Sequence, residues 1–279
     1  MSITLDDIIF CFIILLPLAI FLAAARKHWV DPALKKAFKY GLVAGCLAIV
    51  IVRFIYIPIE MYLGGDIRKF LSAPRDWYIT LIACIGIVGL VEEGLKALMA
   101  YIACCFGKLE GFRPTYVFMS FIGCGLGFSI LENIQYYIVF GASAVLPRVL
   151  VSSIAHVGFA CICSYFSMKA FRLMKSPIRT GLLLNVGMIS AAILHGGFDY
   201  LLFSFSVTTI GGFMLAIALM FLYLIHEIWI QALKNDIPPA GYLAVCSACR
   251  ALTVESIRFC PFCGNRVAKI NSFPTVLKK

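Results

Sequence analysis

Two adjacent glutamates and a lysine interrupt a segment that is otherwise apolar. The stretch from Gly89 to Ala100 reads GLVEEGLKALMA and contains Glu92, Glu93 and Lys96. On a helix, Lys96 lies four residues after Glu92 and three after Glu93, so its ammonium can neutralise one of the carboxylates. The other carboxylate can then accept and return a proton, as a general base and acid does. This spacing predicts a site of proton-transfer chemistry.

The next three apolar segments each carry a further polar group. These groups are Glu132 with Asn133, His156, and His195 with Asp199. His195 and Asp199 are spaced i, i+4 and share one helical face. A single histidine in a membrane helix is as often an interhelical hydrogen-bonding residue as a catalytic one. Four polar segments in succession favour a shared site over four separate packing contacts.

This set of side chains is typical of water activation. A glutamate, or a metal ion bound by histidine, can deprotonate water for attack on a carbonyl group, and the remaining polar groups can protonate the leaving amine. The predicted reaction is therefore amide hydrolysis, with Glu92, Glu93, Glu132, His156 and His195 as catalytic candidates and Lys96, Asn133 and Asp199 in support. The residues leave open whether an active-site metal takes part. Ser152 and Ser153 lie one turn from His156 without an identifiable base and orienting group, which disfavours a serine nucleophile.

The composition indicates that these groups are held by membrane helices. Hydrophobic residues make up 62% of the 279 residues, and the mean hydropathy is +0.97, far above soluble domains. Apolar segments about 20 residues long, enough to cross a bilayer core, recur along the chain. We expect an all-α polytopic membrane protein with about seven transmembrane helices, over residues 8–25, 40–58, 78–106, 115–140, 149–171, 181–203 and 208–233.

The helical rise predicts where the polar groups lie along these spans. Glu132, His156 and His195 each lie roughly 7 to 8 residues from the outer end of their span, or about 10 to 12 Å deep. Glu92 lies about 14 residues in, or about 21 Å deep. Its span must therefore start later, tilt, or bend at Gly86 or Gly89 if the carboxylates are to join the others.

Gly123 and Gly127 form a face of small residues on the fourth span. Such a face allows close approach of a neighbouring helix, which is expected to bring polar groups within reach of Glu132. The same face is equally compatible with packing that has no chemical role.

Basic residues gather in alternate loops and set the expected orientation. The rich loops follow the first, third and fifth predicted spans and hold Arg26, Lys27, Lys35, Lys36, Lys39, Lys108, Arg113, Lys169, Arg172, Lys175 and Arg179. Because positively charged loops stay cytoplasmic, the N-terminus is expected outside and the C-terminus in the cytoplasm. Asp6 and Asp7 precede the first span where a signal peptide would carry positive charge, so we expect a retained helix. Orientation and anionic lipid account for the net charge of +10, and no nucleic-acid partner is expected.

A small second domain is predicted after the membrane domain of residues 1–235. Residues 236–279 contain Cys246-x-x-Cys249 and, after ten intervening residues, Cys260-x-x-Cys263. Two such pairs are typical of a zinc ribbon in which four thiolates hold one structural zinc ion, and a metal supplies the stability that about 40 residues lack. Two disulfides or a redox pair are the alternatives, but a reducing cytoplasm disfavours both. We expect the ribbon to bind a cytoplasmic protein partner.

Taken together, the membrane motifs resemble the PrsW family of intramembrane proteases. The resemblance rests on Glu92-Glu93-Gly-Leu-Lys96, on Gly125-Leu-Gly127-Phe128-Ser-Ile-Leu-Glu132-Asn133, on His156 and on His195-x-x-x-Asp199, in that order on successive spans. It covers roughly residues 78–203. It implies a multi-pass protease, in a bacterial cytoplasmic membrane, that cuts a membrane-anchored protein near the outer face, as in regulated proteolysis of an anti-sigma factor. The more distant CAAX prenyl proteases have a longer glutamate-to-arginine spacing and a histidine after the phenylalanine, where this chain has Lys96 and Glu132, so CAAX processing is disfavoured.

Family members of both metal-dependent and glutamate-dependent type have been described. The chain lacks the H-E-x-x-H pair that favours a metal, so the sequence favours water activated by glutamate.

Two other functional classes remain compatible with buried glutamates and histidines. A proton-coupled transporter or channel uses such groups as proton relays, although no repeat of the motifs relates the two halves of this chain. A non-catalytic membrane sensor that signals through the zinc ribbon is the other class. Substitution of Glu92 or Glu93 by glutamine separates the three classes. It should abolish cleavage by a protease, shift the proton dependence of a transporter, and leave the partner binding of a sensor intact.

Overall fold

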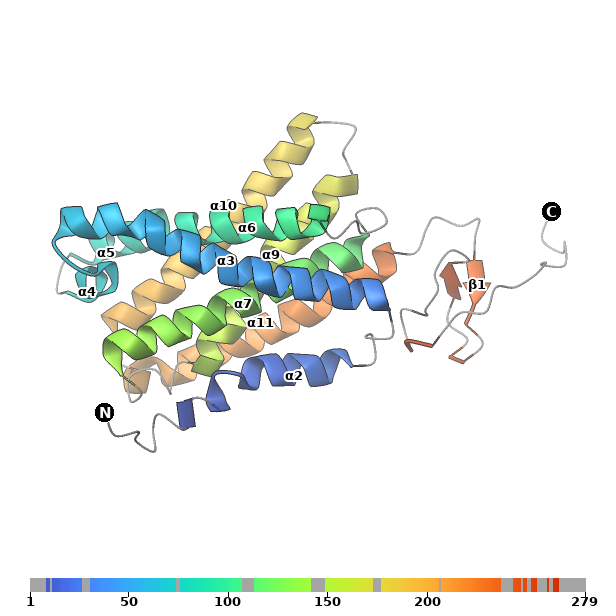
Figure 1. Ribbon diagram of the computed structural model, residues 1–279, viewed down its shortest axis with the longest axis horizontal. Helices are drawn as coiled ribbons and strands as arrows, with labels where there is room; N and C mark the ends of the chain where they lie inside the picture. Colours follow the sequence, from blue (N-terminus) through green and yellow to red (C-terminus); the bar gives the residue numbers. More distant parts are fainter. Residues whose placement is uncertain are drawn as a thin grey trace, which may run out of the picture.

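The computed structural model is an almost entirely helical bundle (Figure 1). It describes the chain except residues 1–8, 11, 27–30, 74–75, 107–112, 142–148, 173–176, 206, 237–242, 247, 250–251, 255–259, 261–262 and 266–279. The elements, in chain order, are α2 (Leu16–Ala25), α3 (Pro32–Leu63), α4 (Ile67–Ser72), α5 (Trp77–Ala83), the π-helix η1 (Cys84–Gly89), α6 (Leu90–Phe106), α7 (Pro114–Phe140), α9 (Val149–Arg172), α10 (Pro177–Ser204), α11 (Val207–Asn235), β1 (Leu243–Val245) and β2 (Leu252–Val254).

The expected fold class is confirmed. Within the described ranges, six helical segments are long and apolar enough to cross a membrane: Pro32–Leu63, Trp77–Cys105, Pro114–Phe140, Val149–Phe171, Ile178–Ser204 and Gly211–Asn235. Large apolar side chains such as Phe54, Leu215 and Leu219 are exposed on the outside of the bundle, as expected for surfaces that face lipid tails. The chain is therefore an integral multi-pass membrane protein.

The first predicted span differs from the expectation of one continuous helix. In its described part, helical residues 9–10 and 12–13 precede a turn at Ile14 and Leu15, and α2, only ten residues long, follows. Pro17 lies in the first turn of α2, where its missing N–H and fixed φ are tolerated, whereas inside a longer helix it would remove one backbone hydrogen bond. Residues 8 and 11 of this predicted span lie outside the described residues.

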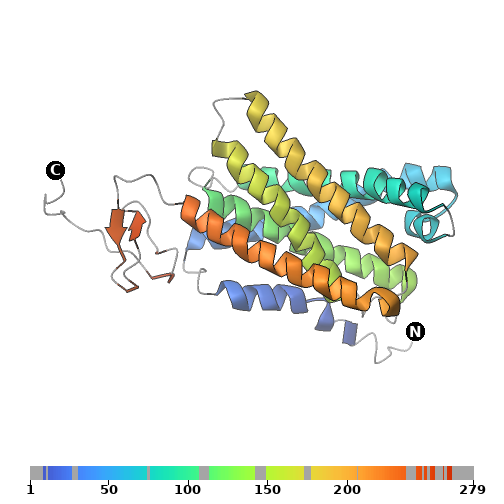
Figure 2. The same ribbon diagram turned by 180° about the vertical axis from the view of Figure 1, so that it is seen from behind.

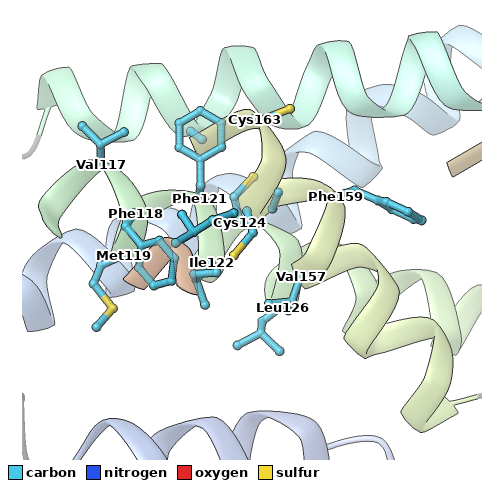
Figure 3. Packing of buried hydrophobic residues seen from close by; sticks show 14 of the residues in the cluster. Val117, Phe118, Met119, Phe121, Ile122, Cys124, Leu126, Val157, Phe159 and Cys163 are labelled. Atoms are coloured by element: carbon cyan, nitrogen blue, oxygen red, sulfur yellow. The ribbon is translucent and has the colours of Figure 1, made fainter. Parts of the chain in front are cut away.

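Helix α7 is the centre of the bundle. It lies between α3 and α6 on one side (Figure 1) and α9 and α11 on the other (Figure 2), while α10 packs against α9, η1 and α6. About 83% of its most apolar window is buried, against 22–33% for four of the other spans. Figure 3 shows its apolar side chains, among them Phe118, Phe121 and Ile122, clustered with Val157 of α9.

Glycines allow α3 and α7 to touch backbone to backbone. A Cβ at Gly123 would collide with the carbonyl oxygen of Phe38, and one at Gly127 with that of Leu42. Gly41 of α3 faces the carbonyl of Ser120 in the same way. The glycine face of α7 thus receives α3, whereas the contact of Glu132 with His156 involves another helix. That helix is α9, where a Cβ at Gly125 would lie 2.9 Å from the carbonyl oxygen of His156.

The π-helix η1 is the irregularity in the third span that allows Glu92 to reach the other polar groups. The third span was expected to tilt, start late, or bend at Gly86 or Gly89, and both glycines lie in η1, which joins α5 to α6. A π-helix holds more residues per turn than an α-helix, so it changes the direction in which later side chains point, and such segments often lie at functional sites. A Cβ at Gly89 would collide with the carbonyl oxygen of Ala192, and one at Gly196 with the backbone of Ile85. Helix α10 can therefore pack directly against this segment.

We expect Gly196→Ala to destabilise the protein by about 1 to 3 kcal/mol or more, because its methyl group would have to displace backbone atoms of η1. Gly197→Ala is the matched control, since a Cβ there meets nothing within 4 Å, and alanine is the better helix former. Thermal unfolding of the two purified variants in detergent measures the difference. Equal midpoints for the two would contradict this account of the contact.

A buried acid joins the end of the last span to the start of α7. Asp236 follows α11, and its side chain is fully buried against Arg113, with Nη2 2.9 Å from Oδ2. Its carboxylate also accepts hydrogen bonds from the backbone N–H and the hydroxyl of Thr115 in the first turn of α7, where a helix favours negative charge. Figure 1 shows β1 beyond this end of the bundle and α4 at the opposite end. Strands β1 and β2 pair antiparallel, with Ala244 opposite Thr253.

Candidate active site

The polar side chains expected from the four motifs lie together inside the bundle. Glu92 and Glu93, in the first turn of α6, are 4% and 0% exposed. His156 of α9 and His195 of α10 are also buried, and their ring centroids are 5.0 Å apart. Glu132 of α7 lies 2.6 Å from His156. The helices that carry the motifs thus bring each of these groups within 4 Å of at least one other.

Four of these groups form a chain of charge-assisted contacts. Lys96 Nζ lies 2.5 Å from Oε1 of Glu93 and 3.0 Å from Nδ1 of His156. The other ring nitrogen of His156, Nε2, lies 2.6 Å from Oε2 of Glu132. The ammonium also lies 4.1 Å from the ring centroid of Phe128, a cation–π contact. Lys96 is only 2% exposed, and these contacts give its buried ammonium partners within the protein.

These contacts decide the tautomer of His156. An ammonium has only donors, so Nδ1 of His156 must accept from Lys96, and Nε2 then carries the hydrogen that is donated to Glu132. Both nitrogens of His156 are thereby engaged within the protein. In this arrangement His156 orients its neighbours and has no free nitrogen for a water molecule.

His195 differs because one of its nitrogens remains open. Its Nδ1 lies 2.7 Å from Oε1 of Glu93, whereas Nε2 has no hydrogen-bond partner. That nitrogen lies 3.8 Å from Oε2 of Glu92 and 3.5 Å from Oδ2 of Asp199. Oε2 of Glu92 is likewise a buried oxygen without a hydrogen-bond partner. A nitrogen lone pair and a carboxylate oxygen at this separation leave room for a donor that reaches both.

Tyr56 of α3 belongs to this site and was not among the residues proposed from the sequence. Its hydroxyl donates to Oε1 of Glu92 at 3.1 Å, and the residue is only 6% exposed. The sequence does indicate that Tyr56 is buried, because Ala44, Ala48, Val52 and Tyr56 are spaced by four residues and form one buried face of α3. Nothing in the chain around Tyr56 indicates that this face ends at a glutamate.

Asn133 lies beside the site and makes a different contact. Its Nδ2 lies 3.3 Å from the hydroxyl oxygen of Ser153, one turn before His156 on α9. Ser152 is buried and its hydroxyl has no partner. On the other side, the ring of Phe159 stacks on that of His195, with centroids 4.9 Å apart and planes at 19°. The aromatic ring covers the imidazole and limits its movement.

Glu93, His156 and His195 are the three side chains at this site whose donor atoms lie close enough together to consider a metal ion. Two histidines and one carboxylate are a common ligand set for zinc. In this arrangement the set does not fit a metal ion, because the Lys96 ammonium contacts both Glu93 and His156 and both nitrogens of His156 have partners. A divalent cation placed there would repel the ammonium at short range. The site already contains its own cation.

The four cysteines of the C-terminal segment form a second cluster. Their sulfur atoms lie within 4.8 Å of one another, with Cys246 3.6 Å from Cys263 and Cys249 3.5 Å from Cys260. A disulfide would need a separation of about 2.05 Å. Ligands about 2.3 Å from a tetrahedral zinc ion lie roughly 3.8 Å apart, close to the observed separations. The geometry of this cluster therefore suits a metal ion.

Comparisons with known proteins support a single family. Residues 17–225 match the family described as PrsW family intramembrane metalloprotease. A curated relative, Protease PrsW of Shouchella clausii (strain KSM-K16), is 32% identical over 148 residues, which are 53% of this chain and 64% of the relative. The match thus spans less than two thirds of that relative, and no solved structure matches. Because the family match covers more than half of the chain, the protein belongs to the PrsW family of intramembrane metalloproteases.

Proposed function

We propose that this protein is an intramembrane protease that hydrolyses a peptide bond in a membrane-anchored protein with water activated by Glu92 and His195. The observation that carries the proposal is the pair of buried, unpartnered acceptors, Oε2 of Glu92 and Nε2 of His195, 3.8 Å apart. A water molecule can donate one hydrogen to each and still present a lone pair to a carbonyl carbon. Family membership supports the same reaction class.

The reaction uses Glu92 first as a base and then as an acid. The water oxygen bonds to the carbonyl carbon while Oε2 of Glu92 takes one proton, and the carbonyl electron pair moves to its oxygen. When the carbon–nitrogen bond breaks, the proton passes from Glu92 to the leaving nitrogen. The products are a carboxylic acid and an amine, and Glu92 returns to the carboxylate form. His195 orients the water through its second hydrogen, with Asp199 3.5 Å from the same nitrogen.

Four further side chains support this reaction without contacting the water, namely those of Glu93, Lys96, His156 and Glu132. Glu93 accepts from His195 Nδ1, which leaves Nε2 of that ring as an acceptor directed at the water position. Lys96 neutralises Glu93, so two adjacent carboxylates can be buried together. His156 and Glu132 hold the ammonium in place from the other side. No step passes through a metal ion, because Lys96 contacts two of the three donors that would bind one.

The proposed substrate is a membrane-tethered protein cut near the outer face, as in regulated proteolysis of an anti-sigma factor. Residues Ile67 and Leu71 of α4 line the same small cavity as Glu92, and α4 lies at the end of the bundle opposite β1. With basic loops on the cytoplasmic side, the N-terminus lies outside, α4 lies at the outer face and the C-terminus is cytoplasmic. A bacterial cytoplasmic membrane is the proposed location.

The function is tested by comparing protein termini in membranes from cells that express the full chain or its Glu92→Gln variant. Mass spectrometry of terminal peptides should find a single-span protein with a new terminus near its outer boundary only when the wild-type chain is present. Identical sets of termini in the two membranes would overturn the proposal. The protein identified in this way then serves as the reporter substrate for purified enzyme.

We further propose that residues 236–279 form a cytoplasmic zinc ribbon, separate from the membrane domain of residues 1–235, in which Cys246, Cys249, Cys260 and Cys263 hold one structural zinc ion. The separation of the sulfur atoms supports this ligand set. The family match ends at residue 225, so the ribbon is an addition to the matched region, and a cytoplasmic protein partner is its proposed role.

The purified full chain should contain a single zinc ion, and Cys260→Ser should remove it while cleavage by the membrane domain continues. Inductively coupled plasma mass spectrometry on matched protein samples measures the metal content. The Glu93→Gln and His195→Gln variants are the controls, since they should keep the single ion if Lys96 occupies the place of an active-site metal. Loss of zinc from either variant would contradict both assignments, and two ions per chain in the wild type would contradict the assignment of Lys96 to the place of an active-site metal.

A further inference from the structure

A tyrosine outside the family motifs contacts one of the proposed catalytic carboxylates. Tyr56 lies on α3, which carries none of the four polar motifs, and its hydroxyl donates to Oε1 of Glu92 at 3.1 Å. Both residues are buried, at 6% and 4% exposure. The hydroxyl therefore fixes one oxygen of the carboxylate, while the other oxygen, Oε2, has no hydrogen-bond partner.

The position of this hydroxyl is set by close backbone packing. Gly41 and Gly45 of α3 face the carbonyl oxygens of Ser120 and Cys124 on α7, with no room for a Cβ at either glycine. Contacts between backbones leave little freedom for the helix to slide or rotate. Tyr56 lies three turns after Gly45 on the same helix, so the α3–α7 contact determines where its hydroxyl is placed.

A small polar cavity adjoins the contact. Its volume is about 20 Å³, and its lining includes Tyr56, Glu92, Glu132, Asp199 and Arg68. A cavity of this size has room for one water molecule, which needs two to four polar partners. The lining provides such partners, and α4 covers the cavity from the outer end through Ile67 and Leu71, both almost fully buried.

We propose that Tyr56 is a positioning residue that holds Glu92 in the one orientation that presents Oε2 to Nε2 of His195 and to the hydrolytic water. The adjoining cavity, which Glu92 and Asp199 line but His195 does not, is the source of that water. The last torsion of a glutamate side chain is broad, so a carboxylate with no donor rotates freely. A hydrogen bond from Tyr56 to Oε1 restricts that rotation, and it also competes with protonation of the same oxygen. This inference rests on the proposed protease function.

The test compares Tyr56→Phe with Tyr116→Phe in the purified full chain. Tyr116 is the matched control, because it is 4% exposed, its hydroxyl contacts Arg113 at 2.6 Å, and it lies in the first turn of α7, away from the site. Tyr56→Phe should lower kcat by about 10- to 100-fold with little change in KM, as expected for one hydrogen bond to a charged group. Tyr116→Phe should leave both constants within about threefold of wild type. A thermal unfolding midpoint for each variant separates this effect from misfolding.

Infrared spectroscopy provides a readout that does not depend on a substrate. The carboxylate band that disappears in Glu92→Gln should shift in Tyr56→Phe, because one of its two oxygens loses a donor, and should stay unchanged in Tyr116→Phe. An unmoved band together with wild-type kcat in a folded Tyr56→Phe protein would overturn the inference. A moved band in a protein whose wild type cleaves no membrane protein would uphold the contact and overturn the protease function instead.

Discussion

Glu92→Gln should lower the rate of peptide cleavage by about 10²- to 10⁴-fold, the usual contribution of a general base, without unfolding the protein. Glutamine keeps the size of the side chain and can still accept from Tyr56, but it cannot take a proton from water. Of the two adjacent glutamates, Glu92 has the oxygen that faces the open nitrogen of His195. Cleavage of the single-span reporter by purified protein in liposomes measures the rate.

Glu227→Gln is the control for this experiment. Glu227 lies on α11 with its side chain 43% exposed, and its contact at 3.6 Å is with His226, so its substitution should leave cleavage unchanged. The circular dichroism spectrum of each variant reports whether the helices remain. A folded Glu92→Gln variant that cleaves at the wild-type rate would exclude Glu92 as the base.

Glu93→Gln should reduce the free energy of unfolding by about 3 to 5 kcal/mol in addition to reducing cleavage, because it leaves the buried Lys96 ammonium without its closest counter-charge. Lys96→Met should have a similar cost, since Glu93 would then keep its charge with only His195 as a partner. The double variant Glu93→Gln/Lys96→Met removes both charges and should recover most of the lost stability. Unfolding in detergent with increasing denaturant measures all three.

The pair of Arg53 and Glu60 is the control for the buried pair. Arg53 Nη1 lies 2.6 Å from Glu60, but 41% of its side chain is exposed, so Arg53→Met should cost less than about 1 kcal/mol. The decisive quantity is the coupling between positions 93 and 96. If the losses of the two single variants simply add in the double variant, the buried pair does not stabilise the site as described.

Much of the architecture could be predicted from the sequence, because the bilayer imposes simple rules. Apolar length alone located the six long spans. The polar residues in them could be singled out because a buried charge without a role is costly, and the structure does bring Glu92, Glu93, His156 and His195 together. Their catalytic roles remain predictions.

Other features depend on three-dimensional contacts that no local pattern encodes. The π-helix η1 forms where Gly89 and Gly196 let α10 approach, and each glycine is informative only once its partner is known. Tyr56 looks like an ordinary aromatic residue in an apolar helix until α3 packs on α7 and places its hydroxyl at Glu92. The shortening of the first span could have been anticipated from Pro17, which is a local signal.

An experimental density map of the full chain in lipid nanodiscs, at a resolution that shows ordered water, tests the central claim most directly. The account predicts one water molecule hydrogen-bonded to both Oε2 of Glu92 and Nε2 of His195, with the Lys96 ammonium between Glu93 and His156. A metal ion held by Glu93, His156 and His195 would contradict it, as would a Glu92 carboxylate directed at lipid, beyond the reach of a single bridging water.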